Sequence, residues 1–176
     1  NISQKPQFEV TAIGSFKQKP GCPEYVHTAM SAEDISRLCL NECYNPSNER
    51  NKIDRIEIVK ITPTTELDSI SNNIQDPWKV FTCNDKGEGC SANFFDDEYV
   101  LDNKSSLYYA RAIQEPTNMV GGDPLRCELN EAGECIKIRP CYSSGPDFDP
   151  NDDCLALVGE RAWSSPIFLT HPMSIY

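Results

Sequence analysis

Short apolar runs, separated by proline, glycine, asparagine and aspartate, recur along the whole chain. Residues 8–12 alternate apolar and polar side chains with a period of two, as a half-buried strand does. Residues 55–61 are rich in β-branched side chains and end just before Pro63. Runs of this kind predict strands over residues 8–12, 55–61, 78–81, 107–113, 136–138 and 167–169.

One segment has the pattern of a short helix. Ser31 is followed three residues later by Asp34, which is the spacing of a capping box at a helix start. Ile35, Leu38 and Cys39 then fall on one helical face. We expect a short helix that packs on a sheet.

The rhythm of strands and turns favours a mainly β fold. Many short strands between turn signals are typical of an antiparallel β-sandwich. We therefore expect a single Ig-like β-sandwich domain over residues 1–176, with long disulfide-tied loops and one short helix. A chain of this length buries roughly two-thirds of its unfolded surface, enough for one core.

The chain contains nine cysteines in 176 residues. So many cysteines without a metal site indicate an oxidising compartment, so we expect a secreted or periplasmic protein. Because the number is odd, at least one thiol stays free or pairs outside this chain. The nine are Cys22, Cys39, Cys43, Cys83, Cys90, Cys127, Cys135, Cys141 and Cys154.

Turn-forming residues inside three cysteine loops predict three disulfides. Glycines allow the chain to reverse tightly enough to bring two cysteines within bridging distance. The predicted pairs are Cys83–Cys90, Cys127–Cys135 and Cys141–Cys154. Of the remaining Cys22, Cys39 and Cys43, two are expected to pair and one to be left over.

The charge balance excludes one class of partner and the apolar pattern another. Lysine and arginine number 16 against 27 acidic residues, for a formal net charge of −11. With no basic cluster to hold phosphates, we expect no nucleic acid as a partner. No apolar run approaches the ~20 residues of a membrane span.

Oxygen-bearing side chains alternate in one acidic loop, as in the first half of a calcium loop. The candidate calcium ligands are Asp147, Asp149, Asn151 and Asp153. The second half departs from the motif, because Asp152 occupies the glycine position and Val158 the position of the bidentate glutamate. A solvated loop tied at its base by Cys141 and Cys154 is the favoured interpretation, and an irregular calcium site that shares Glu160 is the alternative.

Motifs for hydrolytic or zinc chemistry are missing from the sequence. It has no C-x2-C, G-x-S-x-G or H-E-x-x-H, and its only histidines are His27 and His171. We therefore assign no catalytic residue and no cofactor other than the candidate calcium, and expect no hydrolytic activity of the chain alone.

Two strings near the end of the chain are distinctive: residues 107–117 (LYYARAIQEPT) and 160–168 (ERAWSSPIF). With residues 21–23, 42–47, 55–59 and 76–78, they resemble the C-terminal part of a family of secreted bacterial proteins of unknown function. That family is similar to PHP-type metal-dependent phosphoesterases. The resemblance implies a longer protein with a metal-binding domain rich in histidine and aspartate, followed by a β-rich end that corresponds to this chain. None of the family's metal-ligand motifs falls on this sequence.

This resemblance gives the leading functional hypothesis. The chain is expected to be a non-catalytic C-terminal fragment or subunit that packs against a metal-dependent hydrolase-like domain, in the remainder of a parent protein or in a second subunit. Two alternatives stay open: an extracellular filament or envelope subunit that self-associates through shared edge strands, and a hydrolase subunit that contributes to the entrance of an active site. The candidate interface residues are Tyr108, Tyr109, Arg111, Glu160, Arg161 and Trp163.

Overall fold

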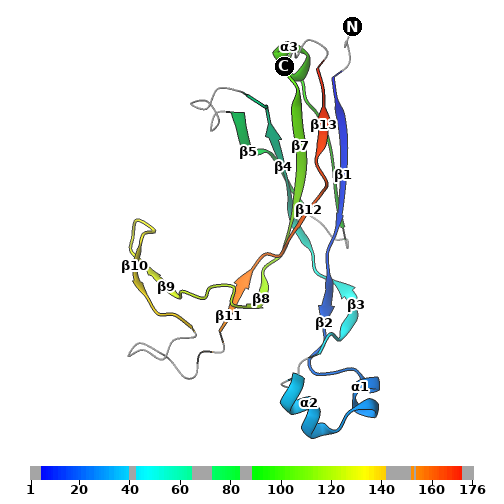
Figure 1. Cartoon of the computed structure of the whole chain (residues 1–176), viewed down its shortest axis with the longest axis vertical. Helices are drawn as coiled ribbons and strands as arrows, with labels where there is room; N and C mark the ends of the chain where they lie inside the picture. The colour runs from blue at the N-terminus through cyan, green and yellow to red at the C-terminus, as the bar shows by residue number, and fades with distance from the viewer. Residues whose placement is uncertain are drawn as a thin grey trace. The chain divides into compact units, whose positions relative to one another are not determined.

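The computed structural model describes residues 5–39, 43–64, 73–83, 89–141, 152 and 154–171. They form a mainly β, antiparallel fold, as the sequence predicts (Figure 1). In chain order the elements are β1 (Gln7–Ile13), β2 (Phe16–Gln18), α1 (Glu24–Ala29), α2 (Ala32–Cys39), β3 (Pro46–Arg50), β4 (Ile53–Ile61), β5 (Ile74–Thr82), β6 (Gly89–Phe95), α3 (Tyr99–Asp102), β7 (Ser106–Gln114), β8 (Thr117–Val120), β9 (Cys127–Leu129), β10 (Cys135–Ile138), β11 (Leu155–Val158), β12 (Arg161–Trp163) and β13 (Ile167–Leu169).

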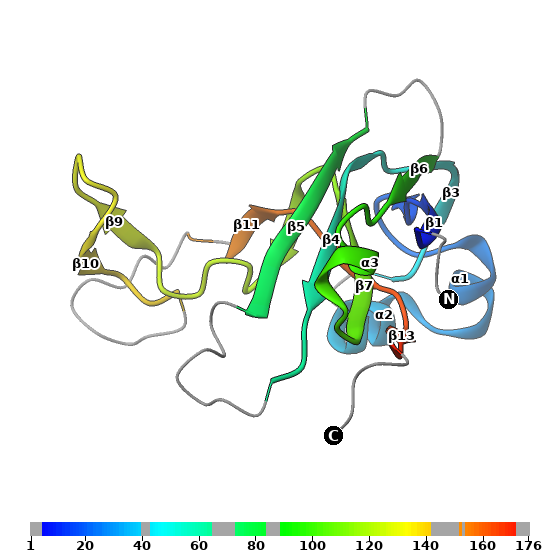
Figure 2. The same cartoon turned by 90° about the horizontal axis from the view of Figure 1, so that it is seen from above.

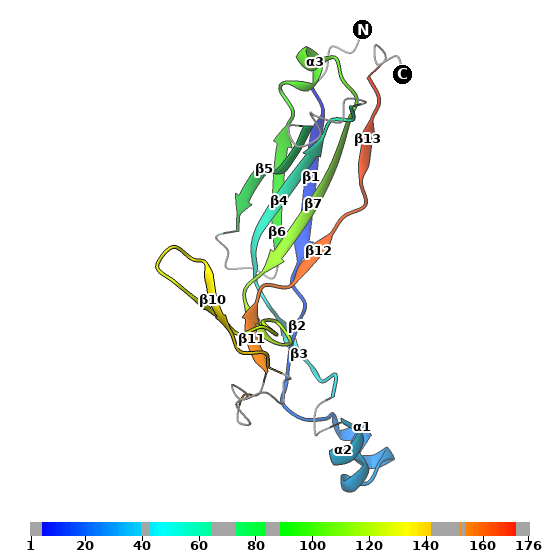
Figure 3. The same ribbon diagram turned by 60° about the vertical axis from the view of Figure 1, so that its left-hand side comes forward.

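The largest sheet has five strands in the order β12-β7-β4-β5, and β13 also pairs with β7. Strand β4 lies between β5 and β7 and is antiparallel to both (Figure 3). Strands β1 and β6 form a separate antiparallel pair, which lies on one side of this sheet (Figure 2). A further short pair joins β2 to β3.

The core lies between the β1–β6 pair and the five-stranded sheet. Phe8 of β1 stands opposite Phe94 of β6, and their rings stack with centroids 5.0 Å apart. Tyr108 of β7 lies 4.7 Å from the Phe8 ring. Ile56 and Ile58 of β4 contribute fully buried side chains from the sheet. Alternate residues of each strand therefore point into this core, as the period of two requires.

The structure divides into two compact units, and the single β-sandwich domain expected over residues 1–176 stays a prediction. One unit comprises Asn1–Gln114 with Ala162–Tyr176, and the other is Glu115–Arg161. Within the second unit β8 pairs with β11, and β9 pairs with β10. This unit also contains two of the disulfides, Cys127–Cys135 and Cys141–Cys154. The insertion has its own cross-links and strand pairs, which explains its separation.

All six predicted strands are confirmed, most of them extended by a few residues. Strands β2, β3, β6, β8, β11 and β12 were not predicted from the sequence. Strand β6 was detectable, because Cys90, Ala92 and Phe94 alternate with polar Ser91 and Asn93. The others are three to five residues long and none of their side chains is buried, so their sequences carry little periodicity.

The predicted helix is α2, and Ser31 caps its start, as one half of a capping box does. The backbone N–H of Asp34 donates to the Ser31 Oγ at 3.1 Å, and the Ser31 hydroxyl donates to the Asp34 carboxylate at 2.8 Å. Ile35 is buried, whereas Leu38 is exposed, so the apolar face is narrower than predicted. The two other described helices, α1 and α3, were not predicted. No helix in the described part of the chain is long and apolar enough to cross a membrane.

Three predicted disulfides are confirmed, and a fourth joins Cys22 to Cys43. Cys39 of α2 is therefore the cysteine left over, with a half-buried free thiol. The Cys83–Cys90 bridge connects the end of β5 to the start of β6. It thus ties the five-stranded sheet to the β1–β6 pair.

We expect a single reactive thiol in the unreduced protein. Treatment of the denatured, unreduced chain with iodoacetamide should label Cys39 and no other cysteine, because the other eight are closed in disulfides. Peptide mapping by mass spectrometry gives the answer. A Cys39→Ser variant should take up no label, and label on any of the other eight cysteines would contradict the pairing.

Candidate functional site

Strand β4 places charged side chains on both faces of the five-stranded sheet. Ile56, Ile58 and Lys60 point toward the core, and the residues between them point to the opposite face, here called the outer face. Glu57 on the outer face and Lys60 on the inner face are both buried, with 9% and 2% of their surface exposed. Buried charges require partners, and each has them.

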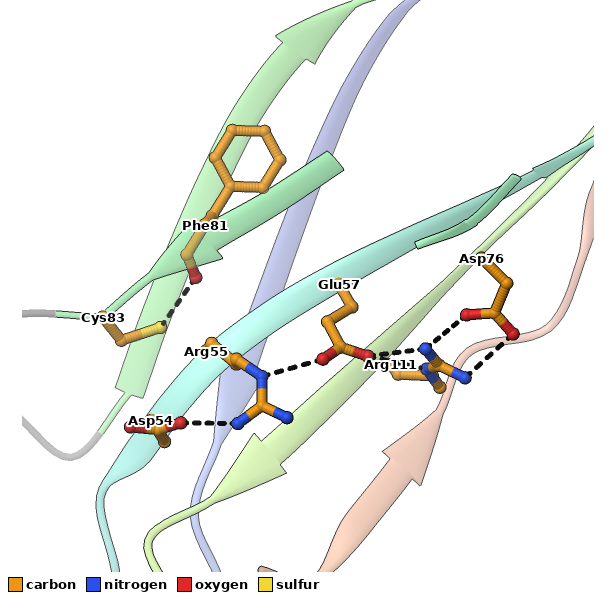
Figure 4. A network of polar contacts seen from close by, with 7 residues as sticks. All are labelled: Asp54, Arg55, Glu57, Asp76, Phe81, Cys83 and Arg111. Atoms are coloured by element: carbon orange, nitrogen blue, oxygen red, sulfur yellow. Dashed lines mark hydrogen bonds and ion pairs between the residues drawn. The ribbon is translucent and has the colours of Figure 1, made fainter. Parts of the chain in front are cut away.

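Glu57 is the centre of an ion-pair network on the outer face (Figure 4). Its carboxylate accepts a hydrogen bond from the Arg55 Nε at 2.7 Å and two from Arg111, at Nη2 (2.6 Å) and Nε (3.0 Å). The Arg111 guanidinium also donates to both carboxylate oxygens of Asp76 on β5. Arg55 in turn donates to Asp54 at 2.7 Å. Residues from three neighbouring strands are thereby joined.

The network keeps Glu57 ionised. Burial by itself raises the pKa of a carboxyl group, but the hydrogen bonds from Arg55 and Arg111 outweigh it and lower the pKa of Glu57 below its ordinary value. The pKa of Arg111 is raised, because its bonds to Glu57 and Asp76 outweigh the effect of burial. Both groups therefore stay charged throughout the physiological pH range.

Exposed apolar side chains flank this network. Residues directly opposite each other on paired strands share a face of the sheet. Val80 stands opposite Glu57, Ile74 opposite Ile61, and Phe168 opposite Leu107. Val80, Ile74 and Phe168 are exposed to 50%, 43% and 69%. The outer face thus combines an ordered charge network with apolar side chains that nothing in the described chain buries fully.

A second polar cluster lies on the core side of the five-stranded sheet, near the C-terminal end of β4. The Lys60 Nζ is 2.7 Å from the Asp96 Oδ2, and the Tyr108 hydroxyl donates to the same oxygen at 2.6 Å. The other oxygen, Oδ1, accepts the backbone N–H groups of Glu98 (3.0 Å) and Tyr99 (3.2 Å). Asp96 has no exposed surface. Its carboxylate is therefore satisfied entirely by protein donors.

The pKa values of this inner cluster follow from the same contacts. Burial acts to raise the pKa of Asp96, but bonds from Lys60 and Tyr108 outweigh it, so the pKa is lowered. Burial and the neighbouring Asp96 raise the pKa of Tyr108 far above its ordinary value. The phenol therefore remains a proton donor at all physiological pH values. Lys60 Nζ also lies 3.7 Å from Asp102 and 5.3 Å from the Trp78 ring centroid.

The structure places the predicted interface residues in three kinds of position. Tyr108 is 2% exposed and belongs to the core, so its assignment to a contact surface was wrong. Its neighbour Tyr109 and Arg111 lie on the outer face, because they stand opposite Val59 and Glu57. The remaining three predicted residues are exposed: Glu160 and Arg161, in the Glu115–Arg161 unit, and Trp163 of β12.

Four residues of these two clusters were not predicted from the sequence: Glu57, Lys60, Asp76 and Asp96. A signal existed for the first two, because a glutamate and a lysine inside the β-branched run 55–61 must find partners if both faces of that strand are covered. Asp76 and Asp96 carry no local signal. Their roles arise from pairing between distant segments.

The candidate calcium ligands Asp147, Asp149, Asn151 and Asp153 lie outside the described residues. Asp152, between two of them, is described and holds Arg126 through two hydrogen bonds, at 2.9 and 2.6 Å. Its carboxylate also accepts the backbone N–H of Cys154, and the bond from Arg126 is the main reason for its lowered pKa.

One group of described side chains brings metal-type donors together: Cys141, Asp152 and Cys154. The two cysteines are joined in a disulfide, and Asp152 is engaged by Arg126. A metal needs free thiolates at such positions, so this group is not a metal site while the disulfide is closed.

Comparison with known proteins assigns no family. No family model, curated protein or solved structure gives a significant match to this chain.

We expect Glu57→Gln to lower the free energy of unfolding by about 1–3 kcal/mol at neutral pH, because two partly exposed guanidinium groups lose a charged acceptor that is itself buried. A carboxyl whose pKa is lowered by folding stabilises the fold above its unfolded pKa, about 4.3 for glutamate. That contribution is lost as the pH falls through the folded pKa. Urea titrations from neutral to acidic pH should therefore show the wild-type advantage shrinking below about pH 4.

Glu9→Gln is the matched control, because Glu9 is exposed on β1. It should change the stability by less than about 0.5 kcal/mol. A wild-type advantage over Glu57→Gln that is the same at neutral and strongly acidic pH would show that ionisation of Glu57 is not its source.

Proposed function

We propose that this chain is a non-catalytic β module that packs, through the outer face of its five-stranded sheet, against a metal-dependent hydrolase-like domain of a larger secreted or periplasmic protein. The observation that carries the proposal is the composition of that face: Glu57 and Arg111 locked in an ion-pair network, with exposed Val80, Ile74 and Phe168 around them.

The outer face has the properties of an interface. Buried arginine and aromatic side chains supply most of the binding energy at protein contacts, and apolar residues exclude water around them. Arg111 is already held by Glu57 and Asp76, so little side-chain freedom is lost when a partner covers it. Tyr109, next to Arg111 on the same face, adds an aromatic side chain.

The class of partner rests on the resemblance of residues 107–117 and 160–168 to the C-terminal part of the phosphoesterase-like family. The first of these strings includes most of β7, the strand that contributes Arg111 and Tyr109 to the outer face. The four disulfides support an oxidising compartment.

The filament alternative is less well supported. Strand β5 has β4 as its neighbour and forms an edge of the sheet. It contains Pro77 and Lys79, and both residue types protect edge strands against pairing with another chain. The outer face is therefore a better candidate surface than the sheet edge.

The test uses the protein translated from the intact reading frame that contains this chain. If the outer face is packed, the chain and its neighbouring domain should unfold in one calorimetric transition. Val80→Asp should split that transition into two, because it places a charge in the contact. Ile13→Asp, an exposed aliphatic residue on β1 away from the outer face, is the control and should leave one transition.

Three results would overturn the proposal. The first is a reading frame with no second folded domain, and the second is a Val80→Asp protein that unfolds like wild type. The third is metal-dependent phosphodiester turnover by the isolated chain that disappears in His27→Ala or His171→Ala, since it would make the chain itself catalytic.

A further inference from the structure

The Lys60–Asp96 pair is unusually isolated from water. The two side chains are 3% and 0% exposed, and they come from different layers: Lys60 from β4 of the five-stranded sheet, and Asp96 from the residue after β6. Aromatic residues surround them, with Tyr108 bonded to Asp96 and Trp78 beside the Lys60 ammonium. Removing two charges from water costs free energy, and the attraction between them in a buried ion pair offsets that cost only in part. A neutral product of the same two groups would remove that cost.

The contacts of the Asp96 carboxylate distinguish its two oxygens. Oδ1 receives two backbone N–H groups, from Glu98 and Tyr99, which is the arrangement that stabilises an oxyanion during attack on a carbonyl carbon. Oδ2 accepts the Tyr108 hydroxyl, a hydrogen-bond donor beside the oxygen that would depart. The nucleophile, Lys60 Nζ, is already within 2.7 Å of Oδ2.

A base is also in place. The Asp102 carboxylate of α3 lies 3.7 Å from the Lys60 Nζ. Unlike Asp96, its side chain is 46% exposed and reaches the solvent. The cluster therefore contains a nucleophile, an electrophile, an oxyanion site, a hydrogen-bond donor to the departing oxygen and a base, drawn from β4, β7, α3 and the segment between β6 and α3.

We propose that Lys60 and Asp96 condense after folding into an intramolecular isopeptide bond that joins the two layers of the fold. The reaction needs no cofactor or oxidant, and the proposal is independent of the partner proposed above.

The Lys60 ammonium first gives one proton to Oδ2 of Asp96, so that a neutral amine faces a neutral carboxylic acid. The amine attacks Cγ of Asp96 to form a C–N bond, and negative charge collects on Oδ1, where the two backbone N–H groups hold it. Asp102 takes a second proton from the nitrogen. The Cγ–Oδ2 bond then breaks while the Tyr108 hydroxyl stabilises Oδ2 through its hydrogen bond, and the departing hydroxyl takes the proton held by Asp102 and leaves as water. One ammonium and one carboxylate thus become one amide and one water.

The decisive measurement is the intact mass of the folded, purified chain after denaturation and full reduction, so that disulfides do not contribute. We expect a mass about 18 Da below the value calculated from the sequence, the loss of one water. Proteolysis should release one branched peptide that contains both Lys60 and Asp96. Dehydration of an aspartate to a succinimide gives the same mass loss, but it leaves Lys60 in a linear peptide.

Matched variants assign the reaction to these groups. Lys60→Met should have its full calculated mass, and Lys104→Met, at an exposed lysine, should keep the loss. Tyr108→Phe should slow the linkage at least tenfold in freshly refolded chain, because the hydrogen-bond donor to Oδ2 is removed while the ring remains. Equal rates would overturn the role of Tyr108.

The wild-type result alone decides the main proposal, even if Lys60→Met does not fold. Full calculated mass in the folded wild-type chain, with Lys60 recovered in a linear peptide, would show a permanent ion pair and overturn the isopeptide bond.

Discussion

The antiparallel pairing of β4 with β7 is the constraint on which the rest of this structure depends. Its register places Ile58 opposite Ala110 and Glu57 opposite Arg111. Because side chains alternate along a strand, a slip of one residue would move every inward residue to the other face. Glu57 would then enter the core, and Ile58 would replace it beside the arginines. The correct register is thus enforced on both faces at once, by apolar packing on one and by ion pairing on the other.

The same pairing explains how β4 can carry charge in a buried position. A strand covered on both faces is usually almost wholly apolar. Here Glu57 and Lys60 interrupt the run, and each has partners of opposite charge: Arg55 of the same strand and Arg111 of β7 for the glutamate, Asp96 and Asp102 for the lysine. Such pairs add little to the free energy of unfolding, because desolvation offsets most of their attraction. An arrangement that separates the partners is strongly unfavourable, however, because it leaves one charge buried without its partner. They therefore select one arrangement of the strands.

The sequence predicted the parts of the fold that depend on local pattern. Alternation identified β1, and a run of β-branched side chains identified β4. The Ser31–Asp34 spacing identified the start of α2, and turn residues inside the cysteine loops identified three disulfides. The candidate sites depend on contacts between distant segments. Asp76 pairs with Arg111, 35 residues later in the sequence, and Asp96 pairs with Lys60, 36 residues earlier. The sequence around each aspartate is the same as that of a solvent-exposed loop residue. The same limit applies to Tyr108. The sequence of β7 does not indicate whether Tyr108 or its neighbour Tyr109 points into the core until the strand partners of β7 are known.

The Glu115–Arg161 unit begins where β7 ends and finishes at β12, which is the neighbour of β7 in the sheet. In topological terms the whole unit occupies the place of a hairpin turn. The entropy of closing such a connection grows only slowly with its length, so the sheet tolerates a long excursion at this point almost as well as a short one. The Glu115–Arg161 unit is stabilised by contacts within itself, namely its two disulfides and the Arg126–Asp152 ion pair. This connection is therefore where the protein can gain, lose or exchange a whole surface without altering the strand order on which its core is built.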